Sequence, residues 1–168
     1  MYKEYSPCSV LAPFIYHFWE YKGETRSGLK FNIPPHGCSD LVFIVGNAAD
    51  CIRNSLIMKP YHSYFFGPMN TFTELVAHTN FIHIIGVRFR PCGLFQFIEI
   101  PLNELANQGI DSQEFPVLFS QSFIYQLCES NQNPIDIIEH ELVRQVYKNN
   151  MDTEKQISYA VSLISRQK

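Results

Sequence analysis

Residues 81–93 have the sequence Phe-Ile-His-Ile-Ile-Gly-Val-Arg-Phe-Arg-Pro-Cys-Gly. Most of the first ten are β-branched, aromatic or apolar and show no helical spacing, which predicts a β-strand. Because side chains alternate in a strand, the odd-numbered residues from 81 to 89 share one face and the even-numbered residues from 82 to 90 share the other. We expect the odd face to be core. The even face starts apolar and ends in Arg88 and Arg90, so we expect it to leave the core there.

The end of this stretch predicts a joint between a sheet and helices. Pro91 has no backbone N–H to donate to a β-ladder, and Gly93 tolerates a positive φ. We therefore expect the strand to stop here and the chain to turn into a helix, with Gly93 at positive φ. The sequence before Phe81 predicts strands and turns, whereas the sequence after Gly93 predicts helices.

The chain before residue 81 is rich in short apolar and aromatic runs separated by Pro, Gly and Asn. With the central strand, these runs predict about six to eight short strands, as expected of an antiparallel β-barrel of the cupin or jelly-roll type. Residues 41–45, Leu-Val-Phe-Ile-Val, are all apolar, which predicts burial on both faces. Further strands are expected at residues 16–22, 31–35, 51–58, 61–66 and 71–78.

Two helical segments are expected soon after the joint. Pro101 suits the first turn of a segment that ends at Gly109. Residues 117–128 carry an apolar face at helical spacing. The region therefore predicts helices and no further strand.

Two more helices are expected towards the end of the sequence. Asn133 and Pro134 form a cap and a first helical position, and the apolar face that follows runs down to residues 149–150. Asp152 caps a last helix that continues to Lys168 without a stop signal. This last helix fits either a docked C-terminal helix or the start of a domain that the sequence does not include.

The predicted fold class is therefore α+β, with an antiparallel β-barrel followed by a small helical layer. We divide the chain into a β-barrel domain, residues 1–93, and a helical subdomain, residues 94–150. Residues 151–168 are interpreted as a linker or the start of a truncated further domain. A hydrophobic content of 46% with 17% charged residues is typical of a globular protein.

The sequence shows no signal for export or membrane insertion, and its cysteines show no pattern of a secreted protein. No apolar run approaches the roughly 20 residues of a membrane span. The N-terminus is polar and has no signal-peptide core, so we expect a cytoplasmic protein without membrane contact. The five cysteines include no Cys-x-x-Cys pair, which argues against a disulfide framework and a zinc ribbon.

The net charge of −3 is divided unevenly along the chain. Residues 1–100 hold 8 Lys/Arg and 7 Asp/Glu, a balance of +1, whereas residues 101–168 hold 5 and 9, a balance of −4. A protein that binds DNA on its own usually presents a basic face. We therefore expect this chain alone not to bind DNA specifically.

No motif indicates catalysis or metal binding. The sequence has no His-x-His pair, and His36 and Cys38, which could face one ion across a turn, are better interpreted as a turn histidine and a buried thiol. There is no Gly-x-Ser-x-Gly elbow, phosphate loop or dinucleotide fingerprint. We expect no enzyme activity, no cofactor and no metal.

The aromatic residues of the predicted sheet have two interpretations. They fill the core, which we favour, or they line a cavity for a small apolar or aromatic ligand. The candidates for such a wall are Tyr16, Trp19, Tyr21, Tyr64 and Phe66.

Arg88 and Arg90 are the best polar candidates for a ligand site. They lie about 6.5–7 Å apart along one face of the predicted strand, a spacing that could hold one carboxylate or phosphate. The favoured alternative is that they pair with Asp40 or Glu74 at the rim of the sheet.

Four short blocks of the sequence carry a family resemblance. Residues 33–43 are Ile-Pro-Pro-His-Gly-Cys-Ser-Asp-Leu-Val-Phe, and residues 86–93 are Gly-Val-Arg-Phe-Arg-Pro-Cys-Gly. The other two are Leu-Ala-Pro-Phe-Ile at 11–15 with Phe-Trp at 18–19, and Pro-Leu-Asn-Glu-Leu at 101–105. As a set, in order and spacing over roughly residues 7–165, they resemble the N-terminal sensor domains of a branch of AraC-type transcriptional regulators.

The resemblance implies a two-part regulator, in which the N-terminal β domain senses an effector or dimerises and a C-terminal pair of helix-turn-helix units contacts DNA. Residues 157–168 resemble the opening helix of that DNA-binding half. The turn of His36, Gly37 and Asp40 is part of the family's P-D-G-x-x-D block. Two positions depart from the pattern: His36 stands where the family has Asp, and Cys92 where it has Gly.

The sequence thus predicts the regulatory domain of an AraC-type transcription regulator, with an unknown small-molecule effector, a homodimer, or both. DNA would be contacted only through the C-terminal half that is absent from this chain. Two alternatives stay open: a stand-alone enzyme or binding protein on a cupin-like barrel, and a dimerisation module without a ligand. A pocket with convergent His and Glu would favour the first, and a fully packed interior the second.

Overall fold

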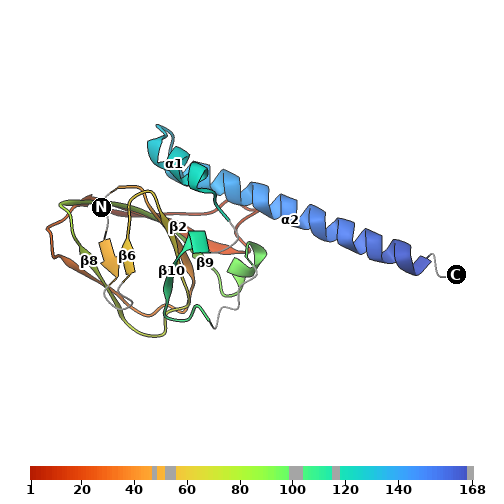
Figure 1. The fold of residues 1–168 in the computed structure, drawn as a ribbon, viewed down its shortest axis with the longest axis horizontal. Coiled ribbons are helices and arrows are strands. Elements are labelled where there is room, and N and C mark those ends of the chain that lie inside the picture. The colour runs from red at the N-terminus through yellow and green to blue at the C-terminus, as the bar shows by residue number, and fades with distance from the viewer. Residues whose placement is uncertain (47–48, 52–55, 99–103, 115–117, 166–168) are drawn as a thin grey trace.

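The computed structural model describes residues 1–46, 49–51, 56–98, 104–114 and 118–165, which form two antiparallel sheets and two α-helices (Figure 1). The larger sheet has the strand order β1-β2-β9-β4-β7-β10, and the smaller sheet has the order β3-β8-β5-β6. The larger sheet consists of β1 (Tyr2–Tyr5), β2 (Ile15–Glu24), β4 (Asp40–Ile44), β7 (Ser63–Phe66), β9 (Phe81–Phe89) and β10 (Gly109–Asp111). The smaller sheet consists of β3 (Lys30–Ile33), β5 (Ala49–Cys51), β6 (Leu56–Met58) and β8 (Thr73–Ala77). The predicted α+β class is confirmed, but across the described ranges the strands pair as two separate sheets and not as one closed barrel.

β9 is the predicted central strand, and it lies between β2 and β4 in the larger sheet. Its odd-numbered residues from 85 to 89 pack in a core that includes both helices, whereas Ile82 and Ile84 pack in a core between the two sheets. The expectation that the even face leaves the core was wrong for Arg88, which lines a cavity between the sheets. Only Arg90, one residue beyond the strand, is exposed.

Alternation along the neighbouring strands divides their side chains between the same two cores. The helix-facing core takes residues from the larger sheet and both helices, including Phe18, Leu41, Phe43, Phe65, Ile124, Leu127, Ile138 and Leu142. The inter-sheet core takes Val42, Ile44, Met58, Tyr64, Phe66, Met69, Ala77, Ile82 and Ile84. The larger sheet is therefore the middle of three layers, which explains why β4 is buried on both faces, as predicted.

The first helix, α1 (Gln121–Glu129), begins where a serine satisfies a free backbone donor. The Ser120 hydroxyl accepts a hydrogen bond from the backbone N–H of Phe123 at 3.2 Å. The second helix, α2 (Pro134–Ser165), begins at Pro134 as predicted, and Asn133 Oδ1 accepts the N–H of Ile135 at 3.1 Å. Within the described residues no helix is long and apolar enough to cross a membrane.

The predicted helix break at residues 149–150 was wrong, because α2 continues without interruption to Ser165. The Asn149 side chain does not cap a new helix but donates a hydrogen bond from Nδ2 to the backbone oxygen of Gln96 at 2.7 Å. The second half of α2 extends beyond the sheets in Figure 1. The predicted domain boundary at residue 151 therefore falls inside one helix.

Two strands were missed by the sequence analysis, and the single strand predicted at residues 51–58 is instead part of two strands, β5 and β6, which pair with each other. β1 pairs with β2 at one edge of the larger sheet, and β10, which lies in a region predicted to be helical, pairs with β7 at the other edge. Between the joint and β10 the chain forms a short 3₁₀ helix, η1 (Gly93–Gln96). The predicted first-turn position of Pro101 lies outside the described residues.

At the joint after β9, the positive φ predicted for Gly93 lies at Cys92 instead. Cys92 has the left-handed backbone, with φ at 64°, whereas Gly93 is not among the positive-φ residues. Gly93 is required for space instead, because a Cβ there would lie 2.1 Å from the carbonyl oxygen of Phe14. Positive φ therefore falls at the position where the resembling family has its additional glycine.

Replacing Cys92 by glycine should increase stability. A left-handed backbone costs an L-residue about 1–2 kcal/mol, and glycine loses part of that gain through chain entropy, so Cys92→Gly should raise the free energy of unfolding by about 0.5–1 kcal/mol. Cys92→Ala is the matched control, since it keeps Cβ and removes only an exposed thiol. Urea denaturation compares the two variants, and equal stability of both would contradict the backbone argument.

Candidate functional site

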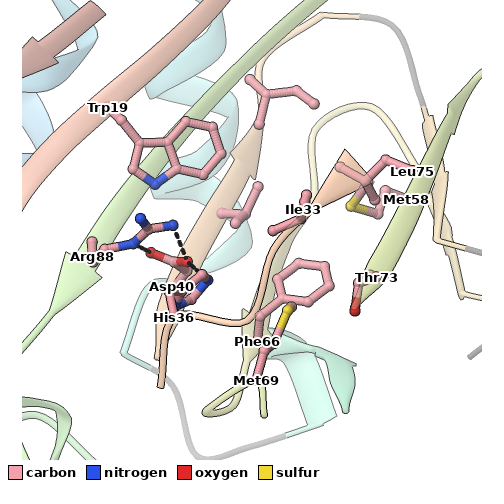
Figure 2. Close-up of a pocket in the computed structure, with 12 residues that line it drawn as sticks. Trp19, Ile33, His36, Asp40, Met58, Phe66, Met69, Thr73, Leu75 and Arg88 are labelled. Atoms are coloured by element: carbon pink, nitrogen blue, oxygen red, sulfur yellow. Dashed lines mark hydrogen bonds and ion pairs between the residues drawn. The ribbon is translucent and has the colours of Figure 1, made fainter. Parts of the chain in front are cut away.

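A cavity of about 290 Å³ lies between the two sheets. One wall comes from β1, β2 and β9 of the larger sheet, and the other from β3, β8 and the residues that follow β3. A smaller hollow of about 50 Å³ adjoins it and is drawn in Figure 2. Both are lined by Trp19, Ile33, Leu75, Ile84 and Arg88. The layer between the sheets is therefore not fully packed. It contains a space large enough for a small ligand.

The walls of the cavity are mainly apolar and aromatic. Tyr21 packs edge-on against Phe31 across the two sheets, with ring centroids 5.4 Å apart. Met58, Phe66 and Met69 line the inner hollow. Such a lining suits the body of a small apolar or aromatic molecule.

Trp19 is held in the cavity wall by a glycine on the next strand. Trp19 in β2 lies opposite Gly86 in β9, and a Cβ at position 86 would be only 1.9 Å from Cε2 of the indole. The ring of Tyr2 stacks on the indole, with centroids 6.3 Å apart. The indole therefore lies flat across the central strand because that strand has no side chain at residue 86.

An ion pair forms the polar end of the cavity, where it adjoins the hollow: Arg88 lines both spaces, whereas Asp40 lines only the hollow. Arg88 donates from Nε to Asp40 Oδ1 at 3.0 Å and from Nη2 to Oδ2 at 2.9 Å, and the two residues are paired across β4 and β9. The Asp40 side chain is 6% exposed and that of Arg88 is 23% exposed. Burial alone would lower the pKa of Arg88, but the hydrogen bonds and charge of Asp40 outweigh this and raise it. The predicted pairing of Arg88 with Asp40 is confirmed.

His36 approaches this pair from the turn before β4. Gly37 gives the turn its positive φ of 64°, and the backbone N–H of Cys38 donates to His36 Nδ1 at 3.2 Å. Burial lowers the pKa of His36, so the ring is neutral near pH 7, and because Nδ1 accepts a hydrogen bond the proton is assigned to Nε2. Nε2 lies 3.3 Å from Asp40 Oδ2 (Figure 2).

Two buried donors at this end of the cavity have no hydrogen-bond partner among the described residues. They are Nε1 of Trp19 and Nε2 of His36, whose geometry towards Asp40 does not form a hydrogen bond. Buried donors of this kind are rare in native proteins and each requires an explanation, such as a ligand.

The other candidate residues divide between the cavity and its surroundings. Trp19 and Tyr21 line the main cavity, and Phe66 lines the inner hollow. Tyr64 is buried in the inter-sheet core, where its hydroxyl accepts the backbone N–H of Lys59 at 2.7 Å. Tyr16 is 43% exposed.

Arg88 and Arg90 do not form one site. Arg90 stacks on the ring of Tyr16 at 4.4 Å and donates from Nε to the carbonyl oxygen of Ala12 at 2.7 Å. Its side chain therefore belongs to the surface near the start of β2, whereas Arg88 faces the cavity. The shared site for a carboxylate or phosphate, which the sequence analysis considered but did not favour, is therefore not formed.

His36 and Cys38, considered as metal ligands, are joined instead by the backbone hydrogen bond to Nδ1. Burial raises the pKa of the Cys38 thiol. In the part of the chain that the structure describes, no group of three or more His, Cys, Asp or Glu side chains gathers in a way that could hold a metal ion.

Several wall residues were missed by the sequence analysis, namely Tyr2, Phe31, Asn32, Ile33, Pro34, Leu75, Ile82 and Ile84. The last two could have been found, because the alternation of β9 places them on the face of Arg88. The residues of β3 and β8 could not, because only the pairing of the smaller sheet brings them opposite Trp19.

A protein-family model described as "Domain of unknown function (DUF6597)" matches residues 3–111. The matched span begins within β1 and ends with β10, so it contains both sheets and neither α-helix. All the wall residues named above except Tyr2 lie inside it. No curated protein matches the sequence.

Removing the charge of Asp40 should destabilise the protein. Asp40→Asn leaves the half-buried Arg88 guanidinium without its carboxylate, and we expect a loss of about 2 kcal/mol in the free energy of unfolding. The matched control is Glu141→Gln, which breaks an Arg–Glu pair whose arginine, Arg144, is 60% exposed and should change stability far less. Similar losses in both variants in urea denaturation would show that the pair at the cavity has no special importance.

His36 should make stability depend on pH. Burial lowers its pKa below the ordinary value of 6.5, with Arg88 adding to the effect and Asp40 opposing it. The unfolded chain then binds a proton at higher pH than the folded one, so stability present above pH 6.5 is lost as the pH falls towards the folded pKa. His36→Gln should flatten the profile of unfolding free energy between pH 7 and 5.

The flattening should be partial, because burial also lowers the pKa of His83, which lies on the other side of the sheet. His83→Gln is therefore the comparison variant. A His36→Gln profile parallel to that of the unmodified protein would show that His36 is protonated equally easily in both states.

Proposed function

The chain belongs to the family of the domain of unknown function DUF6597, and from this premise we propose that it is the regulatory domain of an AraC-type transcription regulator. Domains of this family are common in AraC-type regulators. In this proposal the two-sheet unit senses a small-molecule effector in the cytoplasm, and a DNA-binding half absent from this chain contacts DNA. The observation that carries the proposal is the cavity between the sheets, with its apolar walls and polar end, inside the span that the family model matches.

The two strongest sequence blocks support this proposal because they build one site. The block at residues 33–43 supplies the His36 turn and Asp40, and the block at residues 86–93 supplies Gly86 and Arg88. Asp40 and Arg88 are directly paired in the sheet although the blocks are far apart in the sequence. The blocks therefore resemble the regulator family at positions that act together around the cavity.

The arrangement of the remaining elements agrees with a two-part regulator. Two antiparallel sheets around a cavity suit the jelly-roll-like or cupin-like architecture predicted for the sensor. We propose that α2, which extends beyond the sheets, leads towards the DNA-binding half (Figure 1). Pairing of two chains is a further part of the proposal, since the family resemblance implies dimerisation as well as sensing.

We favour binding over catalysis at this cavity. Both carboxylate oxygens of Asp40 accept from Arg88, and Nδ1 of His36 accepts from the backbone. Neither group is therefore free to act as a strong general base. The alternative of a stand-alone cupin-like enzyme would require turnover of a bound ligand, whereas the proposal requires only that the ligand stabilises the folded chain.

A comparison of DNA binding tests the proposed function. Residues 1–168 alone should not bind the promoter of their own gene specifically, because the net charge is −3. The longer protein encoded by the full reading frame should bind it, with affinity that falls with salt at a logarithmic slope near −0.9 per phosphate contact. Gel shifts at several salt concentrations measure both.

Two outcomes would overturn this proposal. One is tight, sequence-selective and strongly salt-dependent binding by residues 1–168 alone, which would place the DNA-contacting surface in the supposed sensor. The other is a reading frame without a helix-turn-helix pair beyond Lys168, which would leave no DNA-binding half for the sensor to control.

A further inference from the structure

We propose that the cavity between the sheets binds an uncharged carbonyl compound with an aromatic or apolar body, whose oxygen accepts a hydrogen bond from Trp19 Nε1. This inference rests on the proposed sensing function and names the chemical class of its effector. It is carried by three properties of the cavity: its size, its unpaired donors and its balance of charge.

The size of the cavity limits the body of the ligand. Its volume of about 290 Å³ is roughly twice that of an apolar cavity of about 150 Å³ that binds benzene. The space therefore suits roughly ten to fourteen non-hydrogen atoms, the size of a fused two-ring compound. The flat indole of Trp19 on one wall and the ring of Phe31 on the other favour a flat aromatic body.

The unpaired donors determine what the polar end of the ligand must offer. Figure 2 shows the indole nitrogen of Trp19 on the edge of the ring that faces Arg88 and Asp40. Its N–H is buried without a partner among the described residues, and so is Nε2 of His36, which lines the adjoining hollow and not the main cavity. Because an unpaired buried donor is unfavourable, a ligand oxygen that accepts from it gains affinity that a hydrocarbon lacks.

The balance of charge determines that the ligand is neutral. The charge of Arg88 is already cancelled by the bidentate carboxylate of Asp40, and His36 is neutral near pH 7. A ligand carboxylate would add an uncompensated negative charge beside Asp40, and a ligand ammonium would add a positive charge beside Arg88. Both would lose hydration without gaining a partner of opposite charge, whereas a ketone, ester or amide oxygen carries no such penalty.

Three compounds of nearly the same shape separate these requirements. Naphthalene has the aromatic body alone, 2-acetylnaphthalene adds a neutral carbonyl, and 2-naphthoate adds a carboxylate. The chain has a single tryptophan, so its indole N–H gives one proton–nitrogen resonance in an NMR spectrum of residues 1–168. Titration at pH 7.5 yields the three dissociation constants and shows directly whether the indole proton becomes hydrogen-bonded.

We expect 2-acetylnaphthalene to bind about tenfold more tightly than either naphthalene or 2-naphthoate, the effect of about one hydrogen bond. Only the acetyl compound should move the indole proton resonance downfield. In Trp19→Phe, which removes the N–H and keeps an aromatic ring, the acetyl compound should bind no more tightly than naphthalene; because the indole resonance is lost with Trp19, binding to this variant is followed by the backbone amide resonances. Tyr16→Phe is the matched control on the same strand, outside the cavity, and should keep the tenfold preference.

Each other outcome overturns a defined part of the inference. Tightest binding of 2-naphthoate, or equal binding of all three compounds, would exclude the neutral carbonyl class and leave the sensing function standing. Binding by none of the three would exclude an aromatic body of this size. Failure of the proposed regulatory function is recognised separately, since the chain would then bind 2-acetylnaphthalene as expected while the full-length protein fails to bind its promoter.

Discussion

After its exposed first residue, Phe81, strand β9 is covered on both faces, and the rest of the structure follows from this double covering. Its odd-numbered side chains from 85 to 89 contribute to the helix-facing core, and Ile82 and Ile84 contribute to the inter-sheet core. Full burial of one such side chain is worth about 1.5–3 kcal/mol, so each face needs its own apolar partner layer. The helices supply one layer and the smaller sheet supplies the other. The cavity forms on the second side, where β9 has a glycine and an arginine in place of apolar side chains.

The polar end of that cavity is better explained by binding than by stability. Replacing a buried ion pair by apolar residues is often neutral or stabilising, so a layer selected only for packing has little use for Arg88 and Asp40. The same layer also contains the unpartnered indole N–H of Trp19 and the unpartnered Nε2 of His36. A ligand oxygen would remove the unfavourable contribution of such a donor. The four polar groups together form a recognition site that an empty core would not require.

Much of the fold could be predicted from the sequence because its signals are local. The strand at residues 81–89, the apolar run of β4 and the Asn133-Pro134 cap each depend on neighbouring residues, and each prediction was confirmed. The errors arose where a distant contact competes with a local preference. Asn149 resembles a cap but bonds to Gln96, and Gly93 resembles a positive-φ residue but is needed for its closeness to Phe14. β10 was missed because only its pairing with β7 makes it a strand.

The site was less predictable, since its chemistry depends on which face each strand turns to its neighbours. Arg88 and Arg90 alternate with the same period, yet β9 ends at Phe89, so only Arg88 remains in the sheet opposite Asp40. Trp19 was a candidate for its aromatic ring, but its unpaired N–H is a property of the folded layer and has no trace in the sequence. Local patterns thus locate the walls of a cavity. The groups that give it selectivity appear only when the two sheets come together.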